Sequence, residues 1–124
     1  MKIKVLLVDD HPFVREGVKA CLLRYEQFEV VGEASSGQEA IEKAREFSPD
    51  IIVMDIMMPE MDGIDTMREI RRLAQFRHLP IIAVTAKAMK GDREKCIEAG
   101  AWDYLAKPVD TDQLLSVLRA WLDR

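Results

Sequence analysis

Three aspartates, one threonine and one lysine have the residue types and positions that phosphoryl chemistry requires. They are Asp9, Asp10, Asp55, Thr85 and Lys107, and each lies at the end of a short apolar segment. Carboxylates that lie close together repel one another unless a cation joins them. Oxygen ligands, with no histidine or cysteine required, favour Mg²⁺, which keeps several waters and leaves room for a phosphate oxygen. The formal charges of the three carboxylates, Mg²⁺ and Lys107 cancel, so the set can accept a phosphoryl group.

Each of these residues also has an ordinary structural explanation when it is taken alone. Asp9 and Asp10 could cap a following helix. Thr85 and Lys107 are common types of residue at strand ends. Asp55 is harder to explain, because it lies inside an apolar stretch where an unpaired carboxylate is costly. Taken together and in this order, the five residues favour a shared site.

Short apolar runs predict the strands that would position these side chains. The runs are Ile3–Val8, Val30–Val31, Ile51–Met54, Ile81–Val84 and, more weakly, Trp102–Ala106. Apolar residues at helical spacing fill the intervals. They are Val14, Val18, Cys21, Leu22 and Tyr25; Ala40, Ile41 and Ala44; Ile64, Met67, Ile70 and Ala74; Met89, Cys96 and Ile97; and Leu114, Leu115, Leu118, Trp121 and Leu122.

Local signals mark where several of these helices begin. Ser36 and Glu39 have the spacing of a capping box. Gly63 lies just before the third helix, where it can take an unusual turn. The last helix is expected to start at Asp110 or Thr111.

Five strands that alternate with five helices predict an α/β domain with a parallel sheet and right-handed crossovers. Residues 1–124 would form this single domain, because one core commonly spans about 100–200 residues and nothing is left over for a second. Ligands of an open parallel sheet bind beyond the carboxyl ends of its strands. The five candidate residues are therefore expected to meet at one edge.

The composition favours a globular protein and weighs against other classes. The 124 residues are 48% hydrophobic and 32% charged, and the net charge of −4 disfavours phosphate-driven nucleic-acid binding. No apolar run approaches the roughly 18 residues of a membrane span, and the first residues do not read as a signal peptide. Cys21 and Cys96 are expected to be reduced core thiols in a cytoplasmic setting. The densest basic cluster, expected to be a solvated helix face, is Arg68, Arg71, Arg72 and Arg77.

Four stretches of the chain, in order, resemble the receiver domains of the response-regulator family of two-component signalling. They are Val5–Asp10, Val53–Pro59 followed by Met61–Gly63, Val84–Ala86 and Tyr104–Pro108. Single stretches are weak signals, but together they extend over essentially the whole chain. The resemblance implies a flavodoxin-like three-layer sandwich of five βα units with strand order 2-1-3-4-5. That order would set the first strand beside the third and bring the three aspartates together.

The resemblance assigns a role to each of the acidic residues. Asp55 would be the nucleophile and would form an aspartyl phosphate, with a histidine kinase or a histidine phosphotransfer protein as the donor. Asp10, Asp55 and the backbone carbonyl of Met57 would bind Mg²⁺ directly. Asp9 would act mostly through metal-bound water. The domain would catalyse its own phosphorylation and dephosphorylation without being a turnover enzyme on a separate substrate.

Residues of the last two strands would bind and sense the phosphoryl group. Lys107 would pair with Asp55 and later with a phosphoryl oxygen. The Thr85 hydroxyl and the backbone N–H of Ala86 would contact the other oxygens. Thr85 would move on phosphorylation, and Tyr104 would fill the vacated space unless it is simply a half-buried strand aromatic.

The same resemblance implies an output surface and a lifetime for the phosphoryl group on Asp55. The surface comprises the fourth helix, the fifth strand and the fifth helix; its partner is unknown, and it could also form a homodimer. Gly91 is expected to weaken the first turn of the fourth helix, which suits a mobile role. A cis bond before Pro108 would aim Lys107 inward. Neither Met57 nor Lys87 suits the positioning of an attacking water, so self-hydrolysis should be slow, with a half-life of minutes or longer.

Three other functions are weighed against this one. A hydrolase of the haloacid-dehalogenase type would need a second aspartate two residues after Asp55, where Met57 stands. A flavodoxin-like cofactor binder would need a phosphate loop where Asp9 and Asp10 would repel a phosphate. A receiver fold that serves only as a binding module stays open, although the complete set of acids, hydroxyl and lysine argues against it.

The two halves of the chain also resemble different receivers. Asp10–Gly17 and Val30–Ala34 resemble receivers that precede helix-turn-helix DNA-binding domains. Leu79–Ala86 and the segment through Val109 resemble receivers of hybrid sensor kinases. A recombined or engineered fusion, joined between Gly63 and Leu79, is therefore a further hypothesis.

Overall fold

The computed structural model describes residues 2–56, 63–85, 91–107 and 109–122. Within these ranges five strands alternate with five α-helices, and a short 3₁₀ helix follows the third α-helix. The elements are β1 (Ile3–Val8), α1 (Pro12–Leu23), β2 (Phe28–Ala34), α2 (Gly37–Phe47), β3 (Ile51–Asp55), α3 (Gly63–Arg72), η1 (Ala74–Phe76), β4 (Ile81–Thr85), α4 (Asp92–Ala99), β5 (Asp103–Ala106) and α5 (Thr111–Leu122). The predicted alternation is confirmed.

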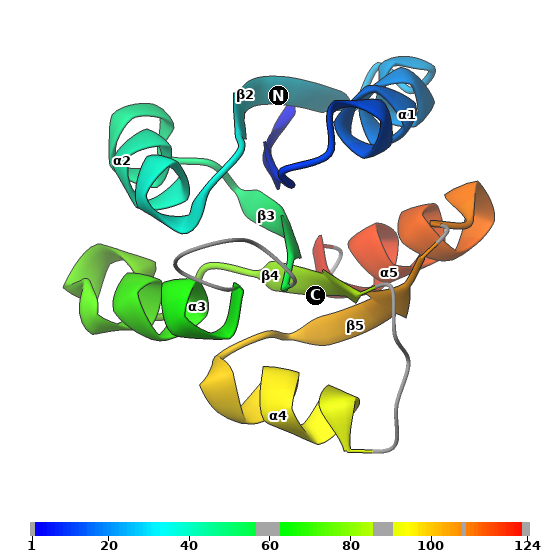
Figure 1. Cartoon of the computed structure of the whole chain (residues 1–124). Helices are drawn as coiled ribbons and strands as arrows, with labels where there is room; N and C mark the ends of the chain where they lie inside the picture. The colour runs from blue at the N-terminus through cyan, green and yellow to red at the C-terminus, as the bar shows by residue number, and fades with distance from the viewer. Residues whose placement is uncertain (1, 57–62, 86–90, 108, 123–124) are drawn as a thin grey trace.

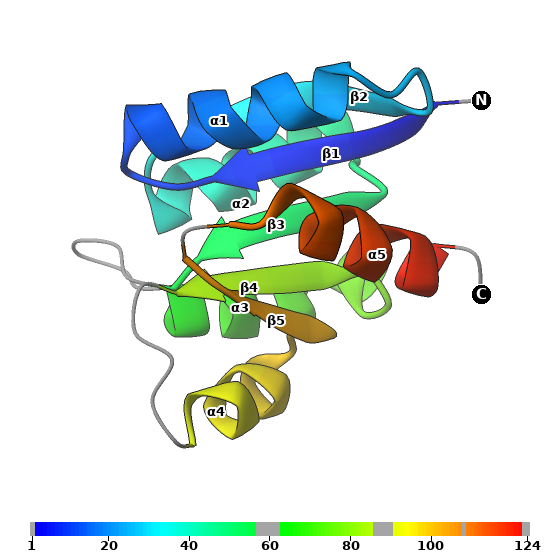
Figure 2. The ribbon, with the colours of Figure 1, turned by 90° about the vertical axis from the view of Figure 1, so that its right-hand side faces the viewer.

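The five strands form one parallel sheet in the order β2-β1-β3-β4-β5. Helices cover both faces: α1 and α5 lie on one side, and α2, α3 and α4 lie on the other (Figures 1 and 2). Val8 of β1 is paired with Met54 of β3. The flavodoxin-like α/β fold is therefore confirmed, and the carboxyl ends of β1 and β3 lie side by side.

Alternate residues of each strand enter two separate apolar layers, as the period of a strand requires. Val5 and Leu7 of β1 pack in the layer beneath α1 and α5, whereas Leu6 and Val8 pack in the layer beneath α2, α3 and α4. All four side chains are at most 2% exposed. Burial of one such side chain contributes about 1.5–3 kcal/mol. The two layers thus fix the strand ends from which the polar residues project.

Side-chain caps start two of the helices where the sequence predicts them. Ser36 Oγ accepts a hydrogen bond from the Glu39 backbone N–H at 3.2 Å. Glu39 Oε1 in turn accepts from the backbone N–H of Ser35 at 3.1 Å, one residue earlier than in a standard capping box. Asp110 Oδ1 accepts from two backbone N–H groups of the first turn of α5. The last helix therefore has Asp110 as its cap.

Several segments differ from the predicted bounds: β3 and β4 extend one residue further, to Asp55 and Thr85, and β5 begins at Asp103 rather than at Trp102. β2 extends well beyond Val30–Val31, because a half-exposed edge strand tolerates residues such as Glu29 and Glu33. Tyr25 lies after the end of α1, although it still packs against the core. Ala74 belongs to η1 rather than to α3.

The two glycines singled out in the sequence have roles other than those predicted. A Cβ on Gly63 would lie 2.4 Å from Ile56 Cα and 2.6 Å from the Asp55 carbonyl oxygen. Among the described glycines, positive φ occurs at Gly91 and Gly100. Gly63 is therefore required for a close approach and not for an unusual turn. Gly91 is the N-cap of α4, with φ of 94°, so it precedes the first turn that it was expected to weaken.

One arginine of the basic cluster is half-buried. Arg71 Nη1 donates to the Phe76 carbonyl at 2.7 Å, and Arg71 Nε donates to the Gly100 carbonyl at 3.1 Å. Burial lowers the pKa of this guanidinium from its ordinary value. Arg71 thus ties α3 to the turn between α4 and β5, which corrects the prediction of a uniformly solvated face. The exposed members of the cluster are Arg68, Arg72 and Arg77.

The apolar stripe of α4 is even thinner than predicted. Cys96 is fully buried, but Ile97 is 40% exposed, and Met89 lies outside the described residues. Cys21 and Cys96 are both buried free cysteines, which confirms that they are core thiols. In the described part of the chain, no helix is both long enough and apolar enough to span a membrane.

Candidate functional site

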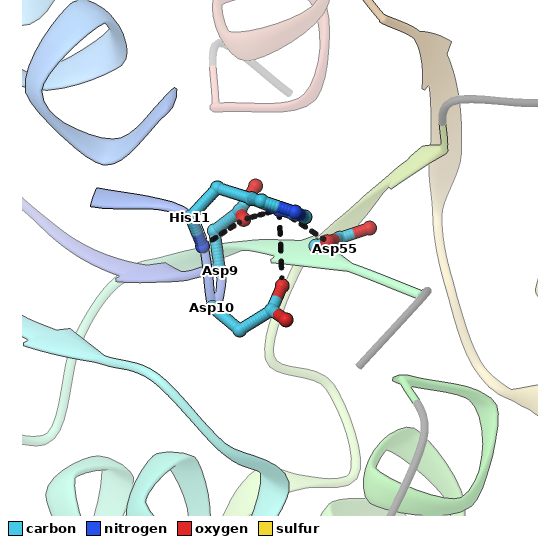
Figure 3. A group of neighbouring side chains, drawn as sticks. All are labelled: Asp9, Asp10, His11 and Asp55. Atoms are coloured by element: carbon cyan, nitrogen blue, oxygen red, sulfur yellow. Dashed lines mark hydrogen bonds and ion pairs between the residues drawn. The ribbon is translucent and has the colours of Figure 1, made fainter. Parts of the chain in front are cut away.

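The three predicted aspartates meet at one edge of the sheet. Asp9 and Asp10 follow β1, and Asp55 is the last residue of β3, so the adjacency of the two strands brings the carboxylates together. Asp9 is 5% exposed and Asp55 is 1% exposed. Figure 3 shows their side chains facing a common space. The predicted convergence of Asp9, Asp10 and Asp55 is therefore present in the structure.

Lys107 reaches this group from the end of β5. Its Nζ lies 2.9 Å from Asp9 Oδ2 and 3.2 Å from Asp55 Oδ2. Burial by itself lowers the pKa of the Lys107 ammonium, but hydrogen bonds and charge interactions with Asp9 and Asp55 outweigh it, so the pKa is raised. The sequence predicted the pair with Asp55; the contact with Asp9 is additional. Lys107 therefore stays cationic and balances part of the acidic charge.

His11 is the site residue that the sequence analysis missed. Its Nδ1 lies 3.0 Å from Asp9 Oδ1, 3.1 Å from Asp10 Oδ1 and 3.9 Å from Asp55 Oδ2. Dashed lines in Figure 3 mark these contacts. Its position directly after Asp9 and Asp10 was a usable signal, because a residue in the same turn shares their edge of the sheet. The His11 side chain is 60% exposed, so it lies on the solvent side of the buried Asp9 and Asp55 carboxylates.

The turn that carries these residues is held by its own hydrogen bonds. The Asp9 backbone N–H donates to the Ala34 carbonyl at 3.0 Å. Asp9 Oδ1 accepts from the His11 backbone N–H at 2.8 Å. Arg15 contacts the Asp9 carbonyl through Nη1 and pairs with Glu33 at 3.4 Å. Asp9 thus closes the turn before α1 and faces the site, whereas the N-cap of α1 is His11, which makes no side-chain capping bond.

The donor set fits a divalent cation. Within the described residues, Asp10 Oδ1 is buried and receives no hydrogen bond. Carboxylate oxygens of Asp9, Asp10 and Asp55 and one ring nitrogen of His11 all lie within 4.8 Å of one another. A buried acceptor that no donor satisfies is costly unless an ion or another group completes it. The geometry can therefore hold a metal ion against the strand ends.

Thr85 and Tyr104 lie on one face of neighbouring strands. Thr85 ends β4 with 1% exposure, and its carbonyl accepts from the Lys107 backbone N–H at 2.7 Å. Tyr104 pairs in register with Ala83, two residues before Thr85. Residues two apart on a strand share a face, and Tyr104 is half-buried against the apolar layer that contains Ala83. Thr85 therefore lies at the edge of the site, and Tyr104 lies on the same face of the sheet, beside the residue two positions before Thr85.

Several predicted positions lie outside the described residues, so their roles stay predictions. They are Met57, Ala86, Lys87 and Pro108, and the side chains of Trp121 and Leu122.

Comparison with known families gives a match over most of the chain. The family model for the response regulator receiver domain matches residues 5–119. The chemotaxis protein CheY of Bacillus subtilis is 41% identical over 124 residues, which span 99% of this chain and 100% of that protein. A nitrate/nitrite response regulator protein homolog of Haemophilus influenzae is 40% identical over 95% of this chain and 56% of its own length. The histidine-protein kinase BarA of Shigella flexneri is 41% identical over 95% of this chain and 13% of its own length.

Solved structures share the same fold. A two-component response regulator of the LuxR family from Aurantimonas sp. superposes with a TM-score of 0.91 and 35% identity, over 100% of this chain and 88% of that one. The receiver domain of a sensor histidine kinase from Pseudomonas aeruginosa superposes with a TM-score of 0.88 and 38% identity over the whole of both chains. That crystal structure has a magnesium ion coordinated in its active-site cleft. Regulators and hybrid kinases thus each match nearly the whole chain, rather than one half each.

Proposed function

The chain belongs to the response-regulator receiver family of two-component signalling, and on this premise we propose that it is a phosphoacceptor switch with Asp55 as the acceptor. The observation that carries the proposal is the setting of Asp55. Its carboxylate is almost fully buried at the end of β3, 3.2 Å from the Lys107 ammonium and beside two further aspartates. Burial of a carboxylate costs desolvation free energy, and buried carboxylates with perturbed surroundings are found most often at functional sites.

The reaction is a transfer between two covalent carriers. An oxygen of Asp55 attacks the phosphorus of a phosphohistidine, and the bond between phosphorus and the donor's ring nitrogen breaks. The electron pair of that bond stays on the imidazole, which takes a proton from solvent. The product is an acyl phosphate on Asp55. Its later attack by water returns the carboxylate and releases inorganic phosphate.

Lys107 and Thr85 would stabilise the transferring group. Lys107 already contacts Asp55, so its ammonium is placed to follow a phosphoryl oxygen without a large movement. The Thr85 hydroxyl and the backbone N–H of Ala86 would serve the remaining oxygens. Each charge-assisted hydrogen bond of this kind is stronger than a neutral one.

Mg²⁺ is the proposed cofactor, and the residues fit it. Asp10, Asp55 and the Met57 carbonyl would hold it directly, and Asp9 would act through water. When bound, Mg²⁺ supplies positive charge that offsets the charge of the phosphoryl oxygens. Asp10 Oδ1 is buried, receives no hydrogen bond and lies 3.1 Å from His11 Nδ1, which supports this assignment. The magnesium ion in the Pseudomonas aeruginosa receiver domain supports it by similarity.

The output would travel from Thr85 to Tyr104. Phosphorylation replaces a carboxylate with a group of about −2 charge and three acceptor oxygens. The shared face of Thr85 and Tyr104 supports a coupled movement, in which Thr85 turns toward the phosphoryl group and Tyr104 turns inward. The surface formed by α4, β5 and α5 would then change, and it would bind an output partner or a second copy of the chain.

The donor would be a histidine kinase or a histidine phosphotransfer protein that docks beside α1. A groove next to Lys107 is lined by Phe13, Val14, Gly17 and Val109. The Phe13 side chain is 94% exposed, and a large exposed apolar group beside a reaction site favours protein contact. A cytoplasmic setting, without direct contact to nucleic acid or membrane, is proposed for this exchange.

Residues 1–124 are proposed to act as one receiver domain. The fusion hypothesis, with a junction between Gly63 and Leu79, remains a prediction. Parent proteins that each match one half would support it, and a natural relative that matches both halves equally would contradict it.

Intact mass spectrometry tests the proposed function directly. Wild-type protein and Asp55→Asn are incubated with acetyl phosphate and Mg²⁺, with EDTA in parallel samples. Wild type should gain one phosphoryl group only when Mg²⁺ is present, and Asp55→Asn should gain none. Asp50→Asn is a suitable control, because Asp50 is exposed at the opposite end of β3 and should leave the gain unchanged. A phosphoryl group on Asp55→Asn would contradict the assignment.

A further inference from the structure

A ring nitrogen lies among the oxygens of the proposed magnesium site. His11 Nδ1 is 3.0 Å from Asp9 Oδ1 and 3.1 Å from Asp10 Oδ1, and it is 3.9 Å from Asp55 Oδ2. In Figure 3 the imidazole lies across the opening between the three carboxylates. Neither the expected ligand set nor the charge balance of the site includes this nitrogen.

These separations are those of atoms that can share one ion. Ligands about 2.1 Å from an octahedral ion lie about 3.0 Å apart at neighbouring positions and about 4.2 Å apart at opposite ones. Asp9 and Asp10 therefore stand at neighbouring-ligand distances from His11 Nδ1. The distance from Nδ1 to Asp55 Oδ2 falls between the values for neighbouring and for opposite ligands. Asp10 Oδ1, which receives no hydrogen bond, is one of these oxygens.

The imidazole Nδ1 is engaged with the site, because it shares a hydrogen bond with Asp9 Oδ1 at 3.0 Å. His11 is the N-cap of α1, yet its side chain makes no capping hydrogen bond to the helix. The turn before the helix is closed by a separate bond, in which the His11 backbone N–H donates to Asp9 Oδ1. The ring can therefore leave its contact with Asp9 for an ion while the backbone of the turn stays as it is.

We propose that His11 Nδ1 is a metal ligand, so that this site also takes a late first-row divalent ion such as Co²⁺ or Ni²⁺ through one nitrogen and the carboxylates. The proposal rests on the proposed function, because it uses the same carboxylates. Imidazole suits these ions, whereas Mg²⁺ prefers oxygen ligands and keeps its waters. His11 would thus shift the preference of the site from Mg²⁺ toward transition-metal ions.

Calorimetric titration of the whole chain with Co²⁺ and with Mg²⁺, at one fixed pH, tests this preference. The variants are His11→Ala, which removes the nitrogen, and His78→Ala, which removes the other histidine of the chain. His78 is exposed, follows η1 and serves as the matched control. His11→Ala should weaken Co²⁺ binding about tenfold or more, the size of loss seen when metal-site partners are removed. Mg²⁺ binding should change less than about threefold, and His78→Ala should match wild type.

Proton NMR of the Co²⁺-loaded protein supplies a second readout. A coordinated imidazole gives strongly shifted ring signals, which should be present in wild type and His78→Ala and absent in His11→Ala. Thermal unfolding in EDTA verifies that each variant is folded. Equal loss of Co²⁺ and Mg²⁺ affinity, unchanged Co²⁺ affinity, or shifted signals that persist in His11→Ala would overturn the proposal and leave the magnesium site standing. Failure of wild type to bind either ion would overturn the proposed site itself.

Discussion

Lys107 Nζ lies 3.2 Å from Asp55 Oδ2, so one ion pair joins the ends of β3 and β5 across the intervening strand β4. The same ammonium is 2.9 Å from Asp9 Oδ2. A single ammonium thus contacts the carboxylate of Asp9, which follows β1, and that of Asp55, which ends β3. The stability of this edge and its chemistry therefore depend on one side chain.

Replacing Lys107 with methionine should destabilise the protein when no divalent ion is present. The change leaves the carboxylates of Asp9 and Asp55 without their cation, and such a loss costs about 1–3 kcal/mol. Saturating Mg²⁺ should reduce the difference in unfolding free energy between wild type and Lys107→Met, because the ion neutralises the same carboxylate oxygens. Urea unfolding at neutral pH, with EDTA and with Mg²⁺, measures both values. Lys95→Met, on the exposed face of α4, should change the free energy of unfolding by less than about 0.5 kcal/mol.

The stability due to Lys107 should also depend on pH in a defined window. The folded protein raises the pKa of Lys107 above its ordinary value of 10.5. The contribution of the charged form is therefore complete below about pH 10.5 and is lost as pH rises through the folded pKa. The difference in unfolding free energy between wild type and Lys107→Met should stay level from about pH 7 to 9 and shrink toward pH 11. A difference that grows with alkaline pH would contradict the assigned pair.

Adding one methyl group at Gly63 should disturb the phosphoacceptor. Its Cβ would lie 2.4 Å from Ile56 Cα and 2.6 Å from the Asp55 carbonyl oxygen, and both are backbone atoms that cannot rotate away. Gly63→Ala should therefore cost about 1–3 kcal/mol of stability and reduce the rate of phosphorylation by acetyl phosphate. Gly17→Ala is the control, because a Cβ there meets nothing within 4 Å in the middle of α1. That change should stabilise the protein by about 0.5–1 kcal/mol.

Removing the donors of Arg71 should loosen the turn between α4 and β5. Arg71→Met keeps an unbranched apolar side chain but leaves the Phe76 and Gly100 carbonyls without its hydrogen bonds. The three lost hydrogen bonds should cost about 1–3 kcal/mol, and amide hydrogen exchange should speed up at Gly100 and Ala101. Arg72→Met removes a surface pair with Glu69 and should cost less than about 0.5 kcal/mol. Equal effects of the two variants would refute the structural role of Arg71.

The hydroxyl of Thr85 should be needed more for the conformational change that follows phosphorylation than for phosphorylation of Asp55 itself. Thr85→Ala and Thr85→Ser should both gain a phosphoryl group, since Asp55 and Lys107 remain. Thr85→Ser keeps the hydroxyl, so the amide resonances around Tyr104 should still shift on phosphorylation. In Thr85→Ala those shifts should largely vanish. Wild-type shifts in Thr85→Ala would show that the relay does not pass through this residue.

The phosphoryl group on Asp55 should last for minutes or longer. Met57 and Lys87 cannot orient an attacking water as an acid or amide could. Loss of label after removal of the donor measures the lifetime, and a half-life of seconds would contradict the prediction. Met57→Glu should shorten it, whereas Met54→Leu, a buried volume-conserving change in β3, should not.

The strands and the acidic residues at their ends could be predicted because short apolar runs and their polar ends carry that information locally. The strand order came from the resemblance to receiver domains. Ile3–Val8 was predicted to the residue, and Asp55 was placed at the end of its strand. The exceptions depend on contacts between distant segments. The close approach at Gly63 depends on where α3 packs, and the partners of Arg71 lie on other elements. The place of His11 beside Asp9 and Asp10 could be read from the sequence, but the direction of its side chain into the site could not.

The acids of the site come from the first 55 residues, whereas its cation comes from residue 107. Neither half of the chain is electrically balanced at this edge without the other. Suppose that two receivers exchanged their C-terminal halves at a point between residues 55 and 107. Each product would then have the acidic residues from one parent and the lysine from the other. Such hybrids would keep the charged groups of the site even when their outer surfaces came from different parent proteins. Recombination between receivers would therefore preserve the site in this fold.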